Sequence, residues 1–190
     1  MCGMKQDFLI KEQNKLKFSF SFAEMLITNN YNNPVFLCVG NSQVVGDLFG
    51  PLCGETLINK YNLKTVYGNL TNNITSKNIN FVYEKIRQEY PLSPIIVLDA
   101  GLGEIEDLGK ISLCNYGCLP ASKTNKTVMG NISILAKVNV VGISDFMFLK
   151  SVKYNKVLVA VNFVCDAIVK GLSLKNIYEK NSNKLIANWV

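Results

Sequence analysis

The sequence predicts an α/β domain in which a parallel sheet is covered by helices on both faces. Continuously apolar stretches at residues 35–39 and 94–98 are typical of strands that are buried on both sides. Stretches with helical spacing of apolar residues lie between and after them, and this alternation indicates parallel strands joined by helices. A length of 190 residues fits a single domain with its own core, spanning 1–190.

The first third of the chain leads from a polar segment into the sheet. Residues 1–33 are polar and mixed, and we interpret them as an N-terminal extension with one short helix at 22–29. An asparagine-rich stretch that ends in a proline then breaks the chain before strand 35–39. A helix at 47–61 and a second strand at 63–67 complete the first strand–helix–strand unit.

The next unit carries the third strand. Residues 78–90 show helical spacing of apolar side chains and predict a helix that ends before a proline. Residues 94–98 then form the third strand, which we expect to stop at Asp99. Gly101 and Gly103 follow, and they would let the backbone turn sharply there.

The second half of the chain is less regular. Strands are predicted at 110–113 and 131–140, on either side of a polar loop at 121–127. Residues 156–170 predict a strong helix. We interpret residues 173–190 as a C-terminal tail, in which Leu185-Ile186 and Trp189-Val190 could form a short edge strand.

Composition excludes several classes of function. The net charge is +6, but the lysines are scattered and Arg87 is the only arginine, which disfavours nucleic-acid binding. The longest apolar stretch, at 157–169, contains Asn162 and Asp166 and is too short and polar to span a bilayer. Because the N-terminus lacks the apolar region of a signal peptide, we expect a cytoplasmic protein without a membrane partner.

The cysteines and the absence of histidine limit the catalytic mechanisms and metal sites that are possible. The chain has six cysteines and no histidine, so Ser-His-Asp and Cys-His mechanisms are excluded. Cys38 and Cys165 lie in apolar stretches and are expected in the core. Cys114 and Cys118 form a C-x3-C pattern that is not typical of zinc or redox sites. We therefore expect no metal and no cofactor.

The glycine-rich segment after the first buried strand is the first candidate for a site. Its spacing, Gly40-x5-Gly46-x3-Gly50, fits neither the dinucleotide-binding fingerprint nor the phosphate-binding loop. The segment also holds one acid, Asp47. By itself, this acid would be explained as the cap of the following helix.

A second acid, Asp99, makes a catalytic interpretation possible. The carboxyl ends of parallel strands meet at one edge of a sheet, so Asp47 and Asp99 would share a crevice if their strands are neighbours. Two facing carboxylates have coupled pKa values, and one can hold a proton while the other is ionised. Such a pair activates water for amide hydrolysis or holds a metal through oxygen ligands, whereas each acid alone could simply cap its element.

Four segments in order carry a resemblance to a known family: FLCVGNSQVVGDLFGPLCGETL, VYGNL, IIVLDAGLGEIEDLGKI and GNISILAKVNV. Over residues 34–172 the chain resembles the YyaC family of sporulation proteins, which is related to the spore germination protease. The resemblance implies a three-layer α/β/α sandwich with a mostly parallel central sheet. That is a phosphorylase/hydrolase-like fold, shared with the hydrogenase-maturation peptidases.

The resemblance also implies a function. The germination protease is an aspartic-type peptidase of small acid-soluble spore proteins, and its two acids fall on Asp47 and Asp99. By this likeness the chain is a sporulation-associated peptidase that acts on a protein or peptide in the cytoplasm of the forespore. The implied substrate-binding wall is formed by five residues: Gly40, Asn41, Gly46, Gly101 and Asn131.

The chain departs from the family pattern in three places. Residues 73–76 replace a PVHA segment, Asn131 replaces an acid, and residues 119–121 replace a KPG loop. Catalysis could therefore be lost, and a non-catalytic binding or regulatory protein on the same scaffold is the alternative. Metal-dependent maturation is a third hypothesis, but the histidine of the related nickel site is absent. The sequence leaves the oligomeric state open.

Overall fold

A computed structural model describes residues 3–120, 127–140 and 153–187. Most of the predicted loop 121–127 and the pair Trp189-Val190 lie outside the described residues. In chain order, the described elements are β1 (Lys5–Leu9), α1 (Glu12–Thr28), β2 (Val35–Cys38), η1 (Val45–Asp47), α2 (Phe49–Asn59), β3 (Val66–Tyr67), α3 (Ile79–Glu89), β4 (Ile95–Gly103), η2 (Ile105–Asp107), β5 (Lys110–Cys114), β6 (Ile132–Val140) and α5 (Tyr154–Ala187).

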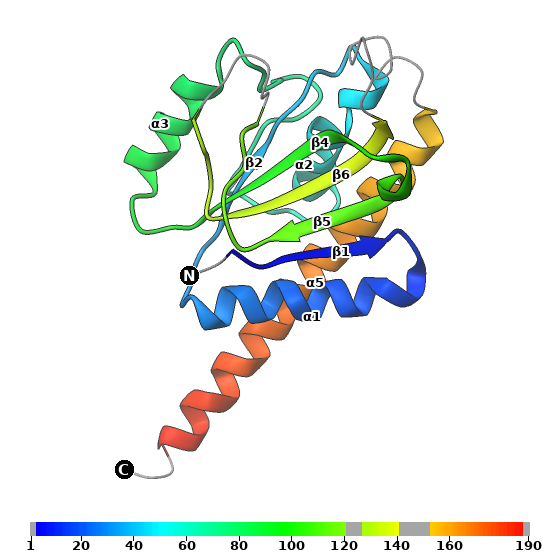
Figure 1. Ribbon diagram of the computed structural model, residues 1–190. Helices are drawn as coiled ribbons and strands as arrows, with labels where there is room; N and C mark the ends of the chain where they lie inside the picture. The colour runs from blue at the N-terminus through cyan, green and yellow to red at the C-terminus, as the bar shows by residue number, and fades with distance from the viewer. Residues whose placement is uncertain (1–2, 121–126, 141–152, 188–190) are drawn as a thin grey trace.

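The described strands form one mixed sheet of six strands in the order β1-β5-β6-β4-β2-β3 (Figure 1). The strands β3, β2, β4 and β6 are parallel, whereas β5 runs antiparallel to both β6 and β1. The prediction of central parallel strands at 35–39 and 94–98 is confirmed, because β4 lies between β6 and β2 and β2 lies between β4 and β3. The fold is therefore α/β, with antiparallel strands at one side of the sheet.

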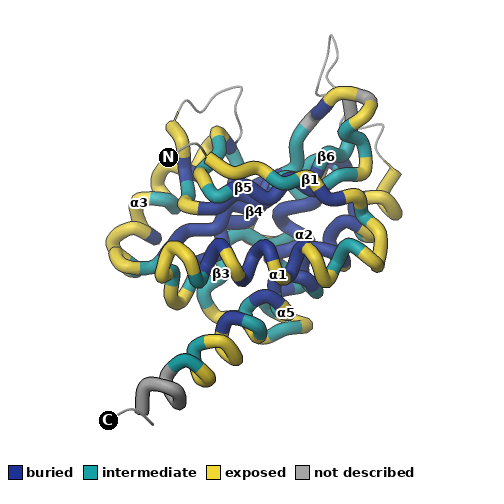
Figure 2. The backbone as a smooth tube through the Cα atoms, turned by 60° about the horizontal axis from the view of Figure 1, so that its bottom comes forward, coloured by how far each residue is buried: buried dark blue, intermediate teal, exposed yellow. Residues whose placement is uncertain are grey.

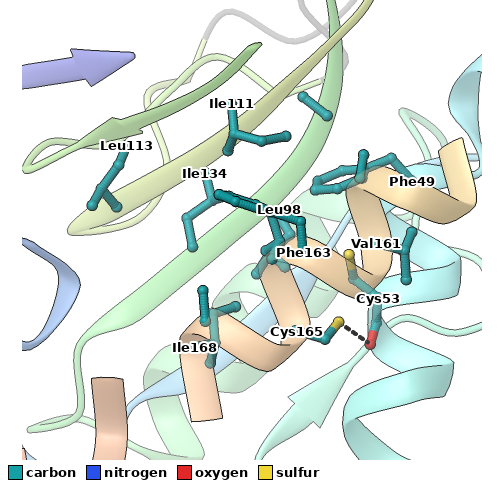
Figure 3. Close-up of a cluster of buried hydrophobic side chains, with 14 of the residues drawn as sticks. Phe49, Cys53, Leu98, Ile111, Leu113, Ile134, Val161, Phe163, Cys165 and Ile168 are labelled. Carbon is teal, nitrogen blue, oxygen red and sulfur yellow. Dashed lines mark hydrogen bonds between the residues drawn. The ribbon is translucent and has the colours of Figure 1, made fainter. Parts of the chain in front are cut away.

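One face of the sheet is covered by α1, α2 and α5 (Figure 1). Alternate residues of β2, β4, β5 and β6 point into this larger core, where they meet the buried side chains of the three helices. Figure 3 shows the packing of Leu98 from β4 and Ile134 from β6 against Phe163 and Ile168 of α5. The expected core position of the cysteines is confirmed, since Cys38 and Cys165 are fully buried.

The opposite face carries a smaller core with α3. Val35, Leu37 and Val97 point to this side and pack with Ile79 and Ile86 of the helix. The strands β2 and β4 are therefore apolar on both faces, which is the reason for their continuous apolar sequence.

The N-terminal segment is more extensive than the sequence predicts. The expected helix at 22–29 is the second half of α1, and β1 adds a strand at the edge of the sheet beside β5. Helix α1 crosses α5 very closely at Gly171, where an added Cβ would lie 2.9 Å from the carbonyl oxygen of Ser19. This part of the chain therefore belongs to the packed body of the protein.

Helix α5 is longer than the predicted helix 156–170 and continues to Ala187, so the expected edge strand at Leu185-Ile186 is wrong. Its second half projects away from the sheet (Figure 2). Residues Tyr154–Ser182 are long and apolar enough to cross a membrane by length and composition alone, but 50% of the most apolar window is buried inside the fold. A core helix of a soluble protein has the same properties.

Candidate functional site

The turn between β2 and α2 is built on close backbone contacts that only glycine permits. A Cβ added to Gly40, which has a φ of +148°, would lie 2.1 Å from the carbonyl oxygen of Asp47. A Cβ added to Gly50 would lie 2.0 Å from the carbonyl oxygen of Val39. Helix α2 therefore begins in direct contact with the end of β2, and η1 is folded back over the turn.

Asp47 closes this turn with its side chain. One carboxylate oxygen accepts a hydrogen bond from the backbone N–H of Asn41, at 2.8 Å, and the side chain is half-buried. Burial raises the pKa of Asp47 from 3.8 to about 6, and the hydrogen bond from Asn41 opposes that rise. The expected cap on α2 is wrong, because no side-chain hydrogen bond caps that helix.

Asn73 fixes the outer side of the same turn. Its side-chain oxygen accepts a hydrogen bond from the N–H of Ser42 at 2.5 Å, and its amide group donates to the carbonyls of Asn69 and Leu70. The N–H of Gly40 donates to the carbonyl of Ile74, at 2.8 Å. This bracing role of Asn73 is not predicted by the sequence. The available signal was the asparagine itself, because asparagine side chains in turns often bond to nearby backbone groups.

Asp99 lies within β4, not at its end. The strand continues to Gly103 and pairs with β6 throughout, with a register shift after Gly101, so the predicted stop at Asp99 is wrong. Asp99 is 8% exposed and faces the same side of the sheet as Val97. Burial raises the pKa of the Cys118 thiol to about 12, and the charge of the Asp99 carboxylate adds to this rise.

The two aspartates lie toward the same end of the parallel strands. Val39, at the end of β2, donates its N–H to the carbonyl of Leu98, directly before Asp99. The segment η1, which contains Asp47, contacts both β4 and α5. However, α2 packs on the larger core, whereas Asp99 faces the α3 side. For the carboxyls of Asp47 and Asp99 to lie close together, the Asp47 side chain must reach around the end of β2. The close approach of the two carboxyls stays a prediction.

The other predicted site residues divide into two groups. Gly40, Asn41 and Gly46 form the turn that holds Asp47, and Gly101 lies two residues beyond Asp99 on the same face of β4. A Cβ added to Gly101 would lie 3.7 Å from the Lys137 ammonium nitrogen, so this position is open.

Asn131 does not join these residues. It directly precedes β6, and its side-chain oxygen accepts the N–H of Ile95 at the first residue of β4, at 2.8 Å. At ~3.3 Å per residue, this point is about 13 Å from Asp99 along the strand. The structure therefore gives Asn131 the role of a strand-start acceptor at the opposite end of the sheet.

Comparison with known proteins places the chain in a family. The model of a family described as "Protein of unknown function (DUF1256)" matches residues 8–167. The chain belongs to the DUF1256 family. It is also 26% identical over 157 residues to "Uncharacterized protein YyaC" of Bacillus subtilis (strain 168), which covers 80% of this chain and 73% of that protein. The resemblance to YyaC is confirmed, but the description of that relative names no activity.

The DUF1256 match covers most of the packed body of the protein. It begins at Phe8 in β1 and therefore includes α1, which the resemblance recognised from sequence did not cover. It ends at Ala167, within α5 and before the projecting half of that helix. The elements that the family model covers are those that form the two cores.

The described part of the site contains carboxyl groups. Among the residues that the structure describes, no group of three or more His, Cys, Asp or Glu side chains could hold a metal ion. The thiols of Cys38, Cys53, Cys114, Cys118 and Cys165 are free. What the described site offers is a carboxyl that titrates near neutral pH, in a rigid turn, close to a strand that carries a second buried carboxyl.

Proposed function

We propose that this protein is a peptidase that hydrolyses amide bonds with Asp47 and Asp99, on a three-layer α/β/α scaffold whose sheet is mostly parallel. The observation that carries the proposal is the half-buried Asp47 carboxyl, whose pKa is raised to about 6 by burial. General acid–base groups work best when their pKa lies near the operating pH, and an ordinary surface aspartate is far from that condition.

The proposed reaction gives the two carboxyls different roles. Asp47 is held in the turn by the N–H of Asn41 and retains a large protonated fraction at pH 6. The proposed step has the Asp99 carboxylate take a proton from the attacking water, while Asp47 donates its proton to the leaving amine nitrogen. The water oxygen forms the new bond to the carbonyl carbon, and the C–N bond then breaks.

The substrate class follows from the family resemblance rather than from the geometry. The germination protease, which the chain resembles, degrades small acid-soluble spore proteins, and we propose the same class of substrate in the forespore cytoplasm. The relative YyaC is described as uncharacterized and supports only the family relationship.

The direct test is incubation of the purified protein with small acid-soluble spore proteins, followed by mass spectrometry of the products. Wild type should release defined fragments, whereas Asp47→Asn and Asp99→Asn should each reduce the rate by roughly 10²–10⁴, the usual worth of a general acid or base. Asp107→Asn is the matched control, because Asp107 is a partly exposed aspartate that pairs with Lys110 and is not among the candidate site residues. This control should cleave at the wild-type rate.

A non-catalytic binding or regulatory role is the second candidate, and one observation favours it. The Asp47 carboxylate already accepts a backbone N–H, and Asp99 faces the α3 side of the sheet. Neither acid lines the two cavities that lie beside Ile10 and Val159. If wild type leaves every spore protein intact but binds one of them, and Asp47→Asn binds equally well, the peptidase proposal fails and the binding role stands.

A further inference from the structure

A cavity of the described protein lies away from both aspartates. It lies between the start of α5 and the end of β6, two elements that lie side by side in Figure 1, and it has a volume of about 530 Å³. Ile10 and the residue pair Leu108 and Gly109 close its other sides. None of the candidate peptidase residues lines it.

The walls of this cavity are apolar. Ala136 and Val138 of β6 and Ala160 of α5 form its inner wall together with Ile10, and Ala136 and Ala160 are each only 1% exposed. Val159 also lines the cavity and is 55% exposed, so it lies where the cavity opens to solvent. A volume of this size with mostly apolar walls is typical of a site for a small organic ligand.

The charged groups among the described lining residues are all lysines. Lys153 and Lys156 line the cavity from the start of α5, together with Asn155, and Lys137 lines it from β6, whereas no acidic side chain is among the described lining residues. Neither the Lys153 nor the Lys156 ammonium forms an ion pair with another described residue. By contrast, Lys15 on α1 and Lys60, directly after α2, are both paired with Asp166.

We propose that this cavity binds a single-chain amphipathic anion, whose aliphatic chain fills the apolar interior and whose carboxylate or phosphate head meets Lys153 and Lys156. Two unpaired ammonium groups at the mouth attract one negative head group, and burial of the chain supplies the main favourable free energy. An adjoining smaller hollow shares Ile10 and Val159 and gives a longer chain a direction in which to extend.

Isothermal titration of the full-length protein with decanoate, below the concentration at which decanoate forms micelles, tests the proposal. Decanoate and decyl phosphate should bind with one site per chain. Decanol, which lacks the charge, should bind at least about tenfold more weakly, the equivalent of one lost charge-assisted hydrogen bond. Decyltrimethylammonium should not bind.

Two variants locate the site. Lys153→Ala combined with Lys156→Ala should weaken decanoate binding by about tenfold or more. Val159→Glu should abolish binding, because it places a negative charge at the mouth, and it should fold because position 159 is exposed. The matched controls are Lys170→Ala with Lys180→Ala, and Ile177→Glu, all at exposed positions of the same helix. These controls should bind as wild type does.

The proposal is overturned if decanoate does not bind, if the cationic amphiphile binds equally well, or if the site and control variants have equal effects. Binding to anionic or neutral phospholipid vesicles without binding of monomeric decanoate would also overturn it, since a membrane surface would then be the ligand. Spore-protein cleavage should be unchanged in Val159→Glu, so failure of this inference is distinguishable from failure of the proposed peptidase activity.

Discussion

Replacement of Asp47 by asparagine should stabilise the protein at neutral pH and leave its stability unchanged in acid. Burial raises the pKa of Asp47 from 3.8 to about 6, so folding favours the protonated form. The stability that this preference contributes is fully present below about pH 3.8 and is lost as the pH rises through about 6. Asparagine is uncharged at every pH and can still accept the N–H of Asn41.

The size of the effect follows from the two pKa values. The interval from 3.8 to about 6, at ~1.36 kcal/mol for each pKa unit, corresponds to about 2–3 kcal/mol. Above pH 7, Asp47→Asn should therefore raise the free energy of unfolding by about this amount, and the difference should disappear near pH 4.

Urea unfolding of wild type and Asp47→Asn at pH 4 and pH 7.5, followed by circular dichroism, measures this difference. A variant that is equally stable or less stable than wild type at pH 7.5 would show that the Asp47 carboxylate is not desolvated. The pKa of Asp47 would then lie near its ordinary value, and the proposed general-acid role would lose its main support.

The remaining predictions concern the packing around the site and are all measured by urea unfolding. Gly50→Ala should lower stability by at least about 2–3 kcal/mol because its Cβ would lie 2.0 Å from the Val39 carbonyl oxygen, whereas Gly101→Ala, with its nearest atom at 3.7 Å, should be nearly neutral. Burial opposes ionisation of Asp166, but hydrogen bonds from Tyr61, Lys15 and Lys60 outweigh it and lower its pKa. Asp166→Asn should therefore destabilise by about 1–2 kcal/mol at pH 7, and the difference should shrink as the pH falls through the carboxylate range. Asn131→Ala should cost about 1–2 kcal/mol by removing the acceptor of the Ile95 N–H, with no change in spore-protein cleavage. If the folded Asn131→Ala variant does not cleave spore proteins, Asn131 belongs to the catalytic site after all.

The strands that could be predicted are those with an unambiguous pattern. The strands β2 and β4 have helices on both faces, so every residue of their first halves is apolar and periodicity is not needed to recognise them. The helix α3 could be predicted because only one of its faces is buried, which gives clear helical spacing.

The elements that were missed lack such a pattern. Helix α1 buries Ser19 and Ser21 beside its apolar residues, and these two serines obscured the spacing of Phe18, Phe22 and Leu26. The extension of α5 beyond residue 170 has few buried side chains, so apolar periodicity ends before the helix does.

The candidate site was predictable only in part. The glycine spacing correctly marked a tight turn at the end of β2, because close backbone approach requires glycine. The end of β4 was misplaced, since Gly101 and Gly103 lie within the strand and pair with β6 rather than form a turn. Asn131 was assigned to the wrong end of the sheet, although it is the first residue of the predicted strand 131–140, and the first residue of a strand parallel to β4 lies at the amino end.

The most direct test of the central claim is whether Asp47 and Asp99 titrate as a pair. Carbon-13 NMR of labelled aspartate carboxyls gives the titration midpoint of Asp47 in wild type and in Asp99→Asn. Burial accounts for a midpoint of about 6, and a facing Asp99 carboxylate would raise it further by favouring the protonated form. The account therefore predicts that the Asp47 midpoint falls in Asp99→Asn. The same midpoint in both proteins would show that the two carboxyls do not share one site and would contradict the proposed mechanism.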